Sequence, residues 1–248
     1  MLKKILGFFV VCISFAAAAA KPMYFDHMAV FGDSLSDNGN LYNYSFHMMP
    51  KSPPYFKGRF SNGPVWSEMF ANSNSISNYS FADYAVGGAG AILSSHLPTP
   101  YTLSTELDKY LSNDDGKYND STLYVVWIGA NNYLSGAENV DEITTDVVNG
   151  IGEGIERLVK VGATMIVIGN LPDLGVIPES KRSDLEKVTH ELAVTHNEKL
   201  WNLKERLVQK YPNVRFVYFD AFDIFNKTMQ SPGDYGITDI THACYEGG

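Results

Sequence analysis

The chain has 248 residues, of which 45% are hydrophobic and 19% are charged, a composition typical of a globular protein with an ample core. Its formal net charge of −9 disfavours nucleic acid as a partner, because nucleic-acid binding calls for a basic surface. The sequence also offers no polybasic patch for anionic lipid headgroups.

Residues 1–20 have the pattern of a secretory signal peptide. Lys3 and Lys4 form a positively charged start, residues 5–15 are apolar, and alanines at 16–20 supply small residues for cleavage. We therefore expect a secreted or periplasmic protein in which residues 21–248 form one domain. No later segment is long and apolar enough to span a bilayer, so we expect no stable membrane anchor.

The chain contains two cysteines, and Cys12 would leave with the signal peptide. Cys244 would then be alone in an oxidising compartment. An odd cysteine in an exported protein indicates either a free thiol or a disulfide partner that this chain does not contain.

Strand-like and helix-like segments alternate along the chain. Apolar or β-branched runs predict strands at 27–31, 78–86, 122–128, 164–168 and 214–219. Helical periodicity predicts helices at 65–71, 103–111, 140–161, 183–210 and 221–229. This alternation favours a mostly parallel sheet with helices on both faces. Gly150, Gly152 and Gly154 predict close packing or a kink in one helix.

Residues 41–66 are rich in Tyr, Pro, Ser and Asn, which predicts a long loop. Loops of this length are uncommon in compact domains and are often functional. Two roles for its aromatic residues are open at this stage: they line an acyl pocket, or they hold a surface loop in place.

Three of the predicted strands end in turns with small or polar residues, at Ser34, at Gly87 and Gly88, and at Asn131. In a parallel sheet these turns lie at the same edge, where open α/β sheets place their ligands. Acyl transfer needs such a group of residues, because a hydroxyl attacks a carbonyl carbon and the resulting oxyanion needs fixed donors. Backbone N–H groups at Ser34 and a glycine, with the Asn131 amide, would supply them.

These turns resemble the sequence blocks of the SGNH or GDSL-type serine hydrolases, in particular the secreted bacterial acylhydrolases and phospholipases. The Gly-Asp-Ser-Leu sequence at 32–35 resembles the first block and implies that Ser34 is the nucleophile. Residues 58–66 are similar to a stretch that follows it. Residues 85–89 resemble the second block, which supplies a glycine N–H to the oxyanion, and Gly88 is favoured over Gly87 for this role. Residues 127–132 resemble the third block, which implies that the Asn131 side chain also donates to the oxyanion. Asn132 stands where the family has aspartate.

The resemblance implies a three-layer α/β/α, flavodoxin-like fold with a five-stranded, mostly parallel sheet. It also implies ester hydrolysis without a metal or an organic cofactor, and no spacing of His with Cys or carboxylates indicates a metal site. We expect Asp33 and Asp37 to brace the Ser34 loop through backbone N–H groups.

The general base of the family is the histidine of an Asp-x-x-His motif near the C-terminus, and this sequence leaves two interpretations of that motif. Asp239 and His242 have this spacing, but Ala243 and Cys244 follow where proline is usual. In one interpretation they are the catalytic pair. In the other, which we favour, they belong to a loop that precedes the motif in the secreted phospholipases, and the chain lacks its last block. The other histidines are expected to be structural.

The leading hypothesis is an exported serine acylhydrolase acting on lysophospholipid or other acyl esters, a preference that comes from the resemblance. Two alternatives are a non-catalytic binding module on the hydrolase scaffold and a carbohydrate O-deacetylase.

Overall fold

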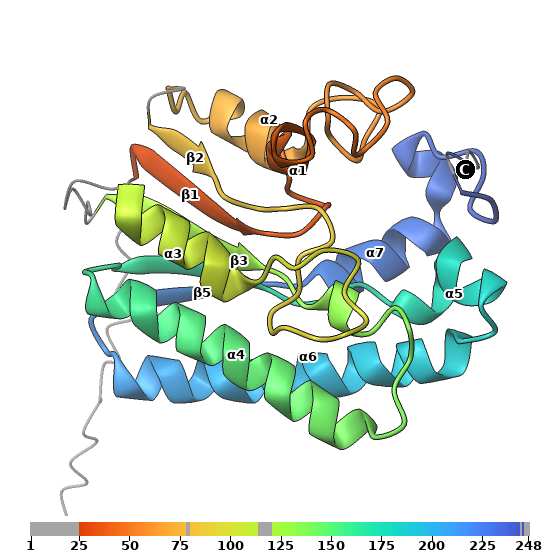
Figure 1. Cartoon of the computed structure of the whole chain (residues 1–248). Coiled ribbons are helices and arrows are strands. Elements are labelled where there is room, and N and C mark those ends of the chain that lie inside the picture. Colours follow the sequence, from red (N-terminus) through yellow and green to blue (C-terminus); the bar gives the residue numbers. More distant parts are fainter. Residues whose placement is uncertain (1–24, 78–79, 114–120, 244, 246–248) are drawn as a thin grey trace, which may run out of the picture.

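The computed structural model of the protein describes residues 25–77, 80–113, 121–243 and 245 (Figure 1). The expected signal peptide and Cys244 lie outside the described residues. In the described part of the chain, no helix has the length and apolar character that a membrane span requires.

Five parallel strands form the sheet, in the order β2-β1-β3-β4-β5. This is the strand order of flavodoxin-like folds, and it confirms the predicted fold class. The strands are β1 (His27–Gly32), β2 (Phe81–Asp83), β3 (Thr122–Trp127), β4 (Met165–Gly169) and β5 (Arg215–Phe219).

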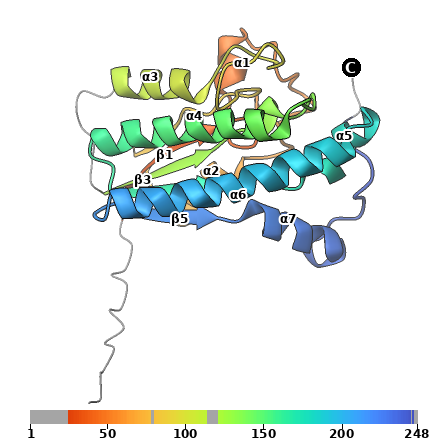
Figure 2. The ribbon, with the colours of Figure 1, turned by 90° about the horizontal axis from the view of Figure 1, so that it is seen from below.

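Helices cover both faces of the sheet, as predicted. The helices are α1 (Asn40–Tyr44), α2 (Trp66–Ser73), α3 (Leu103–Asn113), α4 (Val140–Lys160), α5 (Pro178–Arg182), α6 (Glu186–Lys210) and α7 (Ala221–Gln230). The larger apolar core lies between the sheet and α3, α4 and α6, while α2 packs on the opposite face. Figure 2 shows α4 and α6 running side by side across the larger core.

Two predicted elements differ in extent from the observed ones. Residues 78 and 79 of the strand predicted at 78–86 lie outside the described residues, and from residue 80 onward the strand covers only Phe81–Asp83. The N–H groups of Tyr84 and Val86 still donate to β1 carbonyls. The helix predicted from residue 183 begins at Glu186, and the short α5 precedes it. Turn residues between the two helices produce this break.

Close packing, rather than a kink, explains the glycines of α4. A Cβ at Gly154 would lie 2.6 Å from Leu103 Cδ2, and one at Gly150 would lie 2.4 Å from Ile92 Cγ2. Side chains at these positions would push α3 and the residue 92 loop away from α4, which continues as one helix of 21 residues.

Candidate active site

The sheet brings the ends of β1 and β3 side by side. These strands pair along their whole length, with Gly32 opposite Trp127, and the strand order reverses between them. Ligands of open α/β sheets bind outside the carboxyl ends of the strands at such a reversal. Ser34 follows β1 by two residues, and Asn131 lies in the short 3-10 helix Ala130–Asn132 after β3.

A cavity of about 520 Å³ lies beside Ser34, and we call it the Ser34 cavity. Both Ser34 and Asn131 line it, together with Trp127, so the structure brings two of the predicted site residues to one space. The rest of its wall is mainly apolar and comes from Leu134 after β3, from the loop after β4, from Phe219 at the end of β5, from α7 and from Ile237. Its other apolar residues include Leu174, Ile177, Ile224, Phe225 and Met229. The aromatic residues of the 41–66 loop do not line this cavity, so of the two roles left open by the sequence the structure does not support the acyl-pocket role at this cavity.

Carboxylates hold the Ser34 loop, as the sequence predicted. Asp33 Oδ1 accepts a hydrogen bond from Leu35 N–H at 3.0 Å. Asp37 accepts four, from the N–H groups of Gly39, Asn40, Leu41 and Gly87, at 2.6 to 3.1 Å. Burial raises the pKa of Asp33 to about 6, and it also raises the pKa of Asp37, although the four N–H donors oppose that rise.

A third buried acid, Glu106 on α3, was not predicted from the sequence. Its Oε2 accepts a hydrogen bond from Gly32 N–H at 2.9 Å, and within the described residues its buried Oε1 has no partner. Burial raises the pKa of Glu106 well above its usual value, and Asp83 and Asp33 add to that rise. Nothing in the sequence distinguishes Glu106 from the surface acids of an amphipathic helix.

The structure separates the roles of the two candidate glycines. Gly87 N–H donates to Asp37 Oδ2 at 2.7 Å, so this group is already occupied. Gly88 has a left-handed backbone, with φ of 78°, and a Cβ there would lie 2.8 Å from Pro98 Cγ. In the described part of the chain its N–H has no acceptor. Gly88 does not itself line the Ser34 cavity, so its role as oxyanion donor stays a prediction.

Both asparagines after β3 tie their loop to the glycine turn. Asn131 Nδ2 donates to Ala89 O at 2.8 Å, which fixes the carboxamide and leaves its second N–H. Asn132 Oδ1 accepts from Ala91 N–H at 2.8 Å, while its Nδ2 donates to Ile92 O at 3.0 Å. An ionised aspartate could not donate to Ile92 O, so Asn132 makes a hydrogen bond to this loop that the usual aspartate of the family would lack.

Among the residues that the structure describes, no histidine lines the Ser34 cavity. His242 Nδ1 lies 2.8 Å from Asp239 Oδ2, but 72% of the His242 side chain is exposed and it does not line the Ser34 cavity. Hydrogen bonds from Thr241 and then from His242 lower the pKa of Asp239. The segment that carries the pair runs from the Ser34 cavity, which Ile237 lines, to the 41–66 loop, where the ring of Tyr245 packs on that of Tyr55.

A five-stranded parallel sheet with a serine and an asparagine beside one cavity, at the reversal of the strand order, defines an α/β protein with a candidate site for acyl-transfer chemistry. The sequence matches the GDSL-like Lipase/Acylhydrolase family over residues 28–247, and the chain belongs to this family of hydrolases.

The chain is similar to a phosphatidylcholine-sterol acyltransferase from Aeromonas hydrophila, with 33% identity over 96% of this chain and 70% of the relative. It is 28% identical to the secreted effector protein SseJ from Salmonella typhimurium, over 84% of this chain and 50% of the relative. Among solved structures, the gut microbial diltiazem-metabolizing enzyme BT4096 aligns with 90% of this chain and 42% of its own, at 14% identity and a TM-score of 0.48.

Proposed function

We propose that this protein is a serine ester hydrolase that removes acyl chains from lipid esters such as lysophospholipids. The observation that carries the proposal is that Ser34 and Asn131, from neighbouring strand ends, line one mainly apolar cavity of about 520 Å³. The size and lining of this cavity suit a fatty acyl chain better than an acetyl group, because each buried methylene is stabilised by about 0.8 kcal/mol. A relative whose name refers to phosphatidylcholine also supports a phospholipid substrate.

In the proposed reaction, Ser34 Oγ attacks the carbonyl carbon of the ester and its proton passes to a base. The oxyanion accepts hydrogen bonds from the N–H groups of Ser34 and Gly88 and from the carboxamide of Asn131. The carbon–oxygen bond to the alcohol then breaks, the alcohol leaves with a proton, and water releases the fatty acid from Ser34. Export through residues 1–20 would place this reaction outside the cytoplasm.

A fluorophosphonate probe tests this assignment, because it reacts with an activated serine. We expect a covalent adduct on Ser34 that is absent from Ser34→Ala. Ser36→Ala is a matched control, since Ser36 Oγ is buried and accepts a hydrogen bond from Trp66 Nε1 at 3.0 Å. That variant should lose stability and keep the adduct. An adduct that persists in Ser34→Ala would remove Ser34 from the mechanism.

A second candidate, a binding module without catalysis, is favoured by one observation. In the described ranges no histidine lines the Ser34 cavity, so the serine has no base in place. Complete absence of the adduct in the wild-type protein, with fatty acid binding retained, would favour this candidate.

A further inference from the structure

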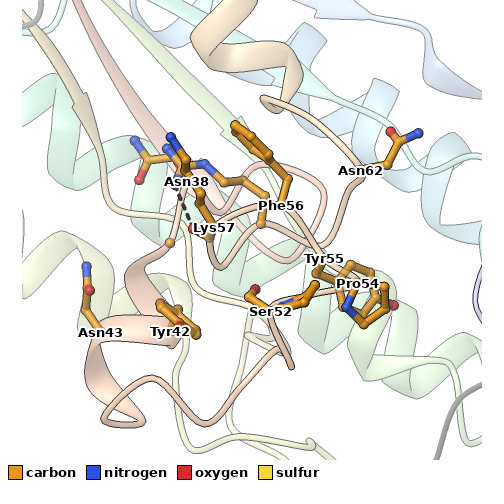
Figure 3. A pocket seen from close by; sticks show the side chains of 12 residues that line it. Asn38, Tyr42, Asn43, Ser52, Pro54, Tyr55, Phe56, Lys57 and Asn62 are labelled. Carbon is orange, nitrogen blue, oxygen red and sulfur yellow. Dashed lines mark hydrogen bonds between the residues drawn. The ribbon is translucent and has the colours of Figure 1, made fainter.

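A second and larger hollow, of about 620 Å³, lies between α1 and the loop that follows it (Figure 3). We call it the loop hollow. In Figure 3, Tyr42 and Asn43 lie on one side of it and Pro54 and Tyr55 on the other. Its lining differs from that of the Ser34 cavity, because amides, aromatic rings and two cationic side chains, Lys57 and Arg59, surround it.

The Ser34 loop borders both spaces. Asp33, Ser34 and Leu35 line the Ser34 cavity, and Asn38 and Gly39, a few residues later, line the loop hollow. An ester has its acyl chain on one side of the reacting carbonyl and its alcohol on the other. A substrate with its acyl chain in the Ser34 cavity would therefore have a polar space for its alcohol at the other end of the same loop.

The charge of the loop hollow is positive in a protein whose formal net charge is −9. Glu68 neutralises Arg59, with Nη2 and Oε1 at 2.5 Å and Nε and Oε2 at 3.2 Å. Lys57 Nζ lies 5.2 Å from the centroid of the Phe56 ring, and among the described residues no carboxylate pairs with it. One ammonium group therefore remains to attract an anion.

The backbone at Lys57 and Gly58 is fixed in an uncommon conformation by its surroundings. Lys57 and Gly58 both have left-handed conformations, with φ of 47° and 84°. Gly58 N–H donates to Ser52 Oγ at 2.9 Å, and a Cβ at Gly58 would lie 2.5 Å from Tyr42 Cβ. Non-glycine residues held in such conformations are found preferentially at functional sites, where the surrounding structure fixes them.

We propose that the loop hollow binds the phosphodiester of a lipid headgroup and that Lys57 makes the cationic contact with the phosphate. The amides of Asn38 and Asn43 are further donors at its wall. Lys57 is then a specificity-determining residue, because it distinguishes phospholipid esters from neutral glycerides. This inference rests on the proposed function for the orientation of the substrate, but headgroup binding itself needs no chemistry at Ser34.

Glycerophosphocholine tests the proposal, because it carries the phosphodiester without an acyl chain. By isothermal titration calorimetry we expect the wild-type protein to bind it and Lys57→Gln to bind about tenfold more weakly, since a charge-assisted hydrogen bond is lost. Lys51→Gln is the matched control, as it removes the same charge from the same loop outside the hollow, and its affinity should not change. Thermal melts of both variants check that each is folded.

Absence of binding, or equal affinity of wild type and Lys57→Gln, would overturn the proposal. Inorganic phosphate is titrated in parallel, and binding of phosphate with no binding of glycerophosphocholine would overturn the headgroup assignment. Ser34→Ala should bind glycerophosphocholine as the wild type does. Absence of the fluorophosphonate adduct would therefore contradict only the proposed hydrolase function. Absence of glycerophosphocholine binding would contradict only the proposed headgroup site in the loop hollow.

Discussion

The side chain of Asp37 joins the Ser34 loop to the glycine turn, because its Oδ2 accepts a hydrogen bond from Gly87 N–H at 2.7 Å across 50 residues of sequence. The same carboxylate also accepts hydrogen bonds from Gly39, Asn40 and Leu41. Two loops that follow different strands are thereby fixed relative to each other. Together with the hydrogen bond from Val86 N–H to Gly32 O, this buried acid sets the relative position of the proposed nucleophile and the proposed Gly88 donor.

Replacement of Asp37 by Asn should destabilise the protein by about 3 kcal/mol. Each carboxylate oxygen accepts two of the four hydrogen bonds, and an amide nitrogen in place of one oxygen would leave two N–H groups without an acceptor. Chemical denaturation at pH 7 measures this difference. Asp234→Asn, at an exposed position, should change the free energy of unfolding by less than about 0.5 kcal/mol. Equal stability of the two variants would contradict the role of Asp37.

The 248-residue chain should hydrolyse p-nitrophenyl esters slowly, because no described histidine lines the Ser34 cavity. Loss of the base of a catalytic serine lowers turnover by a factor on the order of 10⁴ to 10⁶. His242→Ala should leave this slow rate unchanged, as should the control His27→Ala. Full-rate hydrolysis that disappears in His242→Ala alone would instead identify Asp239 and His242 as the catalytic pair.

A charge in the wall of the Ser34 cavity should change the preference for acyl chain length. Ile224 on α7 lines the cavity and is 50% exposed, so Ile224→Glu should fold normally. We expect the ratio of kcat/KM for long-chain over short-chain esters to fall about tenfold, because part of the chain would lie against a carboxylate. Val208→Glu, an exposed position outside the cavity, should keep the wild-type ratio. If the ratio fell equally in both variants, the Ser34 cavity would not determine the preference for acyl chain length.

His196 should make the protein less stable in mild acid. Burial lowers the pKa of His196 to about 3, and its Nδ1 lies 2.8 Å from Tyr133 Oη. The unfolded chain takes up a proton on this histidine below about pH 6.5, whereas the folded protein does not, so stability falls as the pH drops from about 6.5 towards 3.

His196→Gln isolates this effect. Buried acids with raised pKa values, which are Asp33, Asp37, Asp83 and Glu106, act in the opposite direction, because the folded protein holds their protons at higher pH. They are present in both proteins and cancel in the difference. Between pH 7 and pH 5 the free energy of unfolding of the wild type should fall by about 2 kcal/mol relative to the variant. Parallel stability curves would show that His196 is protonated in the fold.

The sequence by itself determined the class of fold and the positions of Ser34 and Asn131. Apolar runs that stop at Gly32 and Gly129 mark strand ends, and parallel strands place such ends at one edge, so local pattern sufficed for these residues. It also predicted that Asp33 and Asp37 brace the loop, because such short-range bonds depend on spacing along the chain.

Only the tertiary structure decided which groups meet across long distances in the sequence. Glu106 lies 74 residues from its partner Gly32, and α7 reaches the Ser34 cavity from almost 200 residues away. Gly87 and Gly88 look alike in sequence, and only the position of Asp37 shows which N–H is occupied. Helical periodicity predicts that a side chain faces a core or solvent, but packing of distant segments decides what it contacts there.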